Sequence, residues 1–137
     1  MEQHWSIVGK VLIEKRIPFE YKSLENMIVT SRPIDFGEMF YMFHFNGNAI
    51  DNFCIHSKSI DQRMAVEVNL LISDINKTLE YGKFYLDSAA YSLAFTSCIR
   101  KRESPDNKKI IQFCQQIFDN TRKYTKEIYE IAGYMKS

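Results

Sequence analysis

The spacing of apolar residues predicts three helices. Apolar positions recur at helical spacing over residues 3–17, where a following proline ends the pattern. A second helix is expected from the capping-box spacing that begins at Ser59, and Gly82 ends it. The third begins at Asp106 and carries apolar residues at about 3.5-residue spacing to about Met135.

Between the first two helices the apolar period drops to two, which is typical of strands. Turn residues divide this stretch into three predicted strands: 27–31, 39–45 and 50–57. Asn46 and Gly47 predict a tight hairpin, so the second and third strands should be antiparallel neighbours. Alternation over 84–86 and 91–95 predicts a second hairpin after the second helix.

The predicted element order is therefore α-β-β-β-α-β-β-α. Hairpins without alternating βαβ units favour the α+β class, with an antiparallel five-stranded sheet, helices packed mainly on one face and a long C-terminal helix. A chain of 137 residues is the length of one domain, so we expect a single domain over 1–137.

One segment of the chain resembles the YbjN family, whose fold is similar to that of type III secretion chaperones. The resemblance follows the element order and rests on six residues: Asn76, Leu79, Gly82, Phe84, Leu86 and Asp87. It implies a non-enzymatic adaptor or chaperone-like domain of a regulatory kind. Secretion chaperones are typically acidic, whereas this chain is nearly neutral. In physical terms Gly82 suits a left-handed helix cap and Asp87 a turn, so the motif specifies a fold and no chemistry.

Charge excludes a dedicated polyanion binder. The chain has 18 basic and 17 acidic residues, a formal net charge of +1, and 45% apolar residues. Basic residues do gather between Arg100 and Lys109, but Glu103 and Asp106 dilute them. We therefore expect a solvated loop there and no nucleic-acid partner.

Several features favour a cytoplasmic protein. The first residues lack the basic start and apolar stretch of a secretory signal, and the longest apolar run, 39–43, is far too short to cross a membrane. The three cysteines form no Cys-x-x-Cys pair, which fits a reducing compartment.

Candidate catalytic and metal-binding groups are sparse. His44, Cys54 and His56 are of ligand type, but the predicted hairpin register separates His44 from the other two. Asp35 and Glu38 lie in a predicted turn, with no nucleophile or histidine partner assignable beside them. We therefore expect no catalytic residue, no cofactor and no metal site, and a protein that is not an enzyme.

The strand over 39–45 is apolar on both faces, although a sheet covered on one side needs only one apolar face. Its pairing puts Phe40 and Met42 with Phe53 and Ile55 on one face. Tyr41, Phe43 and Phe45 lie on the other, with Asn52 and His56, so we predict that this polar-containing face is the outer one. Either a partner covers it, or the first helix or the 31–38 loop does.

The predicted third helix would be about 45 Å long if straight, against a diameter of about 37 Å for a chain of this size. Either it breaks near residues 119–121, which are poor helix formers, or its end projects. We favour a projecting end that lays Tyr124, Ile128 and Ile131 against a second copy, because the apolar stripe continues past 121.

The leading functional hypothesis is a non-enzymatic protein-binding module. Its partner-binding residues would be Tyr41, Phe43, Phe45, Tyr124, Ile128 and Ile131, and its partner another protein or a second copy in a homodimer. The alternative is a small-ligand-binding or enzymatic domain with a pocket between helices and sheet.

Overall fold

The computed structural model describes residues 3–100 and 106–134. Its order is α-β-β-β-β-α-β-β-α, with a short 3-10 turn before the second helix. The elements are α1 (His4–Glu14), β1 (Phe19–Lys22), β2 (Met27–Ile34), β3 (Gly37–Asn46), β4 (Ala49–Ser59), η1 (Gln62–Met64), α2 (Ala65–Asn76), β5 (Lys83–Leu86), β6 (Ser92–Arg100) and α3 (Asn107–Ile131). The α+β class and the long C-terminal helix are confirmed.

The strands form one antiparallel sheet in the order β1-β2-β3-β4-β6-β5. It has six strands, so the predicted five-stranded sheet is wrong by one: β1 was not recognised. This strand is four residues long and has only two apolar positions, Phe19 and Tyr21. So short a strand gives little periodic signal, and it is held by pairing with β2.

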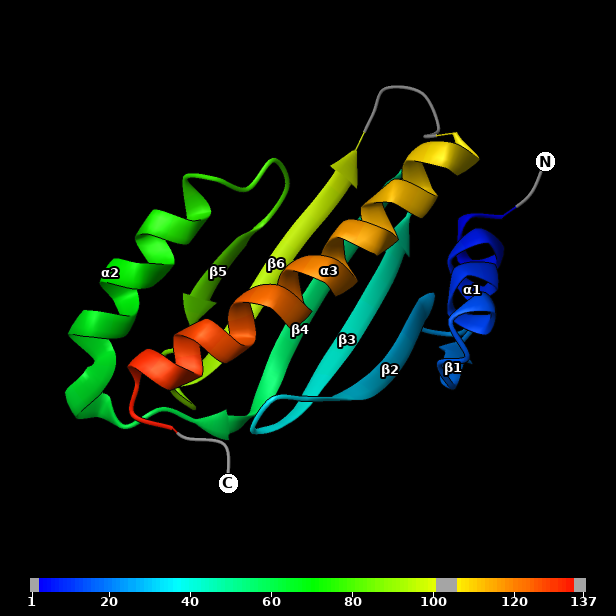
Figure 1. The fold of residues 1–137 in the computed structure, drawn as a ribbon. Coiled ribbons are helices and arrows are strands. Elements are labelled where there is room, and N and C mark those ends of the chain that lie inside the picture. The colour runs from blue at the N-terminus through cyan, green and yellow to red at the C-terminus, as the bar shows by residue number, and fades with distance from the viewer. Residues whose placement is uncertain (1–2, 101–105, 135–137) are drawn as a thin grey trace.

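All three helices lie on the same side of the sheet (Figure 1). The longest, α3, crosses diagonally in front of β6, β4 and β3, while α1 lies near β1 and β2 and α2 near β5. Trp5 of α1 stacks on Tyr21 with ring centroids 4.3 Å apart. The sheet therefore has one face covered by helices and one face without them.

The Tyr41 side of the sheet is the covered face, which corrects the prediction that it is the outer one. Tyr41, Phe43 and Phe45 are at most 5% exposed. The rings of Tyr41 and Phe43 pack against Phe118 of α3, at centroid distances of 4.8 and 6.4 Å. These three aromatic residues are core.

The prediction failed because it took polar side chains as a sign of solvent. Asn52 and His56 share the covered face and are only 2% exposed. Asn52 Nδ2 donates to the carbonyl of Met42 at 3.1 Å, and Ser97 Oγ donates to Asn52 Oδ1 at 3.2 Å. Hydrogen bonds of this kind make a buried amide tolerable.

α3 is unbroken from Asn107 to Ile131, and it does not project. Thr121, at the predicted break, is fully buried, and its Oγ1 lies 2.7 Å from the Tyr41 hydroxyl. Ile128 is also fully buried, so the projecting end predicted for Tyr124, Ile128 and Ile131 is wrong. The helix fits because it crosses the sheet diagonally and spans 25 residues, about 37 Å, while Met135 lies outside the described residues.

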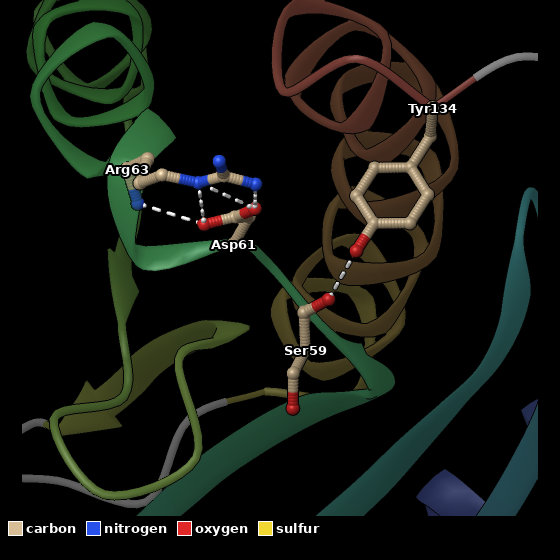
Figure 2. Close-up of polar contacts among 4 residues, drawn as sticks. All are labelled: Ser59, Asp61, Arg63 and Tyr134. Atoms are coloured by element: carbon tan, nitrogen blue, oxygen red, sulfur yellow. Dashed lines mark hydrogen bonds and ion pairs between the residues drawn. The ribbon is translucent and has the colours of Figure 1, made fainter.

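Two tyrosine hydroxyls, one near the end of α3 and one just after it, bond to main-chain carbonyls of β4. Tyr129 Oη donates to the carbonyl of Lys58, and Tyr134 Oη donates to the carbonyl of Ser59 (Figure 2). Ser59 lies in β4, so it does not cap the second helix as predicted. Asp61 caps the short turn η1, where its carboxylate accepts from the Arg63 amide at 2.9 Å. The Arg63 guanidinium beside it holds the pKa of Asp61 at about 2.

Residues of the 76–87 segment have structural roles. Asn76 bonds both main-chain groups of Phe84 on β5, at 2.9 and 2.8 Å. Gly82 has φ +77, and a Cβ there would lie 2.5 Å from the Phe95 ring. Asp87 accepts from the amides of Ala89 and Ala90 in the following turn. The segment places β5 at the edge of the sheet.

Candidate interaction surface

We call the sheet face without helices the open face. It carries a continuous apolar band. Antiparallel pairing places directly opposed residues on the same side, so the register defines its rows. One row runs Ser31, Phe40, Ile55, Ala94 and Tyr85, and the next runs Glu20, Val29, Met42, Phe53, Thr96 and Lys83. The open face thus spans all six strands.

Its centre is apolar and accessible. Phe40 is 45% exposed, the most of any aromatic residue on the sheet. Val29, Met42, Phe53, Ile55 and Tyr85 are half-buried, by one another and not by a helix. A sheet packed on one side needs only one apolar face, so this band is apolar surface beyond what the core requires.

Charged and polar residues lie around the apolar band of the open face. Glu20 on β1 ends one row, and Lys83 on β5 ends it at the opposite edge. In the neighbouring row His44 is paired with Asp51, which lies 3.9 Å from Arg100 in an exposed ion pair. An apolar centre with a charged rim is the usual anatomy of a protein interface.

A hollow of about 380 Å³ indents the open face near β1. β1 begins at Phe19, which pairs with Thr30, so no β1 residue lies beside Ser31 in the row of Phe40. Pro18, Val29 and Phe40 are among the residues that line the hollow. The hollow exists because the edge strand stops short.

A second concavity, of about 420 Å³, lies between β2 and α3 and is basic. Arg32, Arg122 and Lys126 line it, together with Asp35. The Arg32 guanidinium is held over the Phe118 ring at 5.5 Å, while Lys126 also lies 3.8 Å from Glu130. This is the place in the described structure best suited to a small anion.

The cysteine thiols are not activated. Burial is the main cause that raises the pKa of each: of Cys54, of Cys98 and, to about 12, of Cys114. A thiol with a raised pKa carries little thiolate at neutral pH and is a poor nucleophile. Within residues 3–100 and 106–134, the surroundings of the three thiols therefore do not provide the activation that cysteine chemistry requires.

The histidines and Cys54 are separated by the sheet. His44 lies on the open face, whereas Cys54 and His56 lie on the covered face. Within residues 3–100 and 106–134 no group of three or more His, Cys, Asp or Glu side chains is placed to hold a metal ion.

The structure does not bring the six predicted partner-binding residues together on one surface. Tyr41, Phe43, Phe45 and Ile128 are core, Tyr124 packs edge-on against Phe84, and Ile131 is 48% exposed on α3. The accessible residues are Phe40, Met42, Phe53 and Ile55, which the hairpin pattern had grouped correctly on the opposite face. The sequence pattern did not indicate which face of the sheet the helices cover.

The basic cluster predicted between Arg100 and Lys109 lies partly outside the described residues, since 101–105 are not among them. Arg100 and Lys109 line a cavity of about 220 Å³ with Tyr81 and Phe113. No helix within the described parts of the chain is both long and apolar enough to span a bilayer.

Comparison with known proteins gives a fold and no family. No protein family and no curated protein matches the sequence. The crystal structure of YbjN from E. coli matches with a TM-score of 0.61 over 88% of this chain and 89% of that one, at 10% identity. The fold is YbjN-like. YbjN is described as a candidate transcription regulator, and at this identity the likeness to YbjN concerns the fold alone.

Proposed function

We propose that this YbjN-like chain is a non-enzymatic protein-binding domain of an adaptor or regulatory kind, and that the open face is its binding surface. The observation that carries the proposal is the uncovered apolar band centred on Phe40, Met42 and Phe53. Aromatic and methionine side chains are enriched in the centre of protein interfaces, where their burial contributes most of the affinity.

Three further observations support the proposal. The thiols have raised pKa values, which disfavours nucleophilic catalysis. The net charge of +1 favours a protein partner over a nucleic acid. The regulatory part of the proposal draws on YbjN, described as a candidate transcription regulator. We place the activity in the cytoplasm, because all three cysteines are free.

A photoreactive side chain at a single position tests the surface. Placed at position 40, it should cross-link to a polypeptide in the native cell, whether another protein or a second copy. Placed at Leu24, which is 97% exposed on the turn after β1, it should not. A cross-link that is specific to position 40 should also disappear in a Phe53→Asp background, since that change puts a charge in the apolar band.

Equal labelling at positions 40 and 24, or labelling at 40 that survives Phe53→Asp, would contradict the proposal. Both positions are on the surface, so the comparison separates a specific contact from general accessibility.

The basic concavity supports a second candidate function, the binding of a small anionic ligand. Three cationic side chains line it, and no ion pair or hydrogen bond of Arg122 is seen in the described structure. Inorganic phosphate or pyrophosphate should then raise the thermal midpoint by about 3 °C near saturation, and Arg122→Glu should abolish the effect. An equal rise in the variant would indicate a general salt effect.

A further inference from the structure

We infer that the occupant of the open face is a second copy of this chain, bound as a symmetric homodimer whose two-fold axis runs close to the strand direction between β3 and β4. The inference rests on the proposed function and goes beyond it by naming the partner. Three properties of the open face support it: its charges, its shape and its size.

The sheet order fixes what such an axis brings together. In the order β1-β2-β3-β4-β6-β5 the middle lies between β3 and β4. A two-fold axis there, parallel to the strands, lays β3 of one copy over β4 of the other, β2 over β6 and β1 over β5. Phe40 then faces Ile55 of the partner subunit, and Met42 faces Phe53 of the partner subunit, so the apolar bands coincide.

The same operation pairs opposite charges. Glu20 on β1 comes over Lys83 of the partner subunit on β5, twice by symmetry. No ion pair of either side chain is seen within residues 3–100 and 106–134, and both are exposed. His44 comes over Asp51 of the partner subunit. An axis perpendicular to the strands would instead stack β1 on β1 and β5 on β5. Along this row it would lay Glu20 over its own copy and Lys83 over its own copy, which like charges disfavour.

The shapes also match. Tyr85 stands at the β5 end of the row of Phe40, whereas the hollow lies at the β1 end of that row. The two-fold axis exchanges these ends, so the Tyr85 ring of each copy is placed over the hollow of the other. An aromatic side chain placed opposite a hollow of about 380 Å³ is the arrangement of an interface anchor.

The area is sufficient for a reversible dimer. The open face has four rows on β3, those of Glu38, Phe40, Met42 and His44. Six strands about 4.8 Å apart and four rows about 7 Å apart give a face of roughly 24 by 20 Å. Both copies together would bury about 1,000 Å², with side chains adding to this flat estimate, which is near the lower bound of specific interfaces. We therefore expect a dimer that dissociates on dilution.

A charge exchange tests the inference directly. Sedimentation equilibrium at about 0.1 M NaCl would give the dimer dissociation constant of the wild type, Glu20→Lys, Lys83→Glu and the double variant. Each single change should weaken the dimer about ten-fold, because it places like charges together twice, and the double variant should recover to within about three-fold of the wild type. Glu67→Lys on α2, away from the open face, is the matched control and should leave the constant unchanged.

A second variant tests the shape. Tyr85→Ala should weaken the dimer about ten-fold, with circular dichroism confirming that the monomer still folds. A wild type that stays monomeric at about 100 µM would overturn the inference, and so would a double variant that is no better than the singles. If the wild type is monomeric while position 40 still cross-links to another protein, the proposed function stands and the inferred homodimer is wrong. If position 40 cross-links to nothing, the proposed function and the homodimer are both wrong.

Discussion

His56 is buried on the covered face as a neutral side chain with both ring nitrogens bonded. Nε2 donates to the carbonyl of Asp35 at 2.9 Å, and Nδ1 accepts from the amide of Lys58 at 3.0 Å. The ring also packs on Tyr129, with centroids 4.5 Å apart. This one side chain links the turn before β3, the end of β4 and the end of α3.

Lowering the pH should therefore reduce the stability of the folded protein. Burial lowers the pKa of His56 below 6.5, although the Asp35 carbonyl opposes the shift and the charge of Lys58 assists it. Because the folded state binds the proton less readily than the unfolded state, the stability is fully present above about pH 6.5 and is lost as the pH falls toward the folded pKa. Urea unfolding between about pH 7.5 and pH 5 should show the decline.

The control for this prediction is the other described strand histidine. His44→Gln should keep the decline, and His56→Gln should flatten it, at the expense of a lower stability at pH 7.5. A decline of the same size in both variants would show that other groups cause it.

Gly82 and Gly47 both have positive φ, but only one has a crowded Cβ position. At Gly82 a Cβ would meet the Phe95 ring at 2.5 Å and the Thr96 carbonyl at 2.7 Å, whereas at Gly47 nothing lies within 4 Å. Gly82→Ala should reduce the free energy of unfolding by about 2–4 kcal/mol, and Gly47→Ala by about 1 kcal/mol, the cost of the left-handed conformation alone. Urea unfolding of both variants checks this; equal losses would mean that the Phe95 contact relaxes freely.

At the scale of elements, the two edges of the sheet are closed in different ways. On the β5 edge the Asn76 amide donates to and accepts from Phe84, as a neighbouring strand would. At the opposite edge of the sheet, β1 pairs with β2 only as far as Thr30. Pro33 lies in the part of β2 that β1 does not pair with, and a proline has no amide hydrogen to donate to another strand. Both devices limit the main chain available for pairing with another sheet.

Replacing Asn76 should free the β5 edge. Asn76→Ala leaves an amide and a carbonyl of Phe84 without their partner, which should cost about 2 kcal/mol of stability and speed hydrogen exchange at the Phe84 amide. Asn69→Ala, an exposed asparagine in the same helix, is the control and should change neither. Unchanged exchange at Phe84 in Asn76→Ala would show that water replaces the side chain without loss.

The elements differ in how far the sequence could predict them. α3 was recognised from its period, and β3 and β4 from alternation and Gly47, because each carries many apolar positions. β1 has two such positions, and only its pairing with β2 fixes it. The hairpin turn is Gly47-Asn48 rather than Asn46-Gly47, so His44 pairs with Asp51 and not with Ala49. Moving the turn by one position moves the pairing by two residues, which leaves the grouping of faces intact because side chains alternate with a period of two.

At the scale of the whole molecule, the question that local pattern could not answer was which sheet face the helices cover. Both faces of β3 and β4 are apolar, and the polar Asn52 and His56 lie on the inside, where they bond Ser97 and Asp35. Local pattern could not show this, because these partners are remote in sequence. The pattern therefore indicated a second apolar face, which the structure contains, and assigned it to the wrong side. Such assignments depend on tertiary hydrogen bonds, which periodicity does not encode.

Self-association through the open face would link stability to concentration. The thermal midpoint of the wild type should rise as its concentration is raised about 100-fold, because the dimer binds only folded chains. Phe40→Asp should remove this dependence while leaving the dilute midpoint almost unchanged, since Phe40 is 45% exposed in one copy. Differential scanning calorimetry checks both; a midpoint independent of concentration in the wild type would contradict the expectation.

The position of α3 at the end of the chain affects how the protein folds during synthesis. This helix supplies the cover over Tyr41 and Phe43, yet it is translated after all six strands. Until residues 107–131 leave the ribosome, a nascent sheet would present apolar side chains to water on both sides, and at about 5–20 residues per second that interval lasts seconds. The hydroxyl of Tyr41 can bond Thr121, which is 80 residues further along the chain, only after α3 has been synthesised. The nascent sheet therefore passes through a stage with exposed apolar surface, the kind of intermediate that is prone to aggregate.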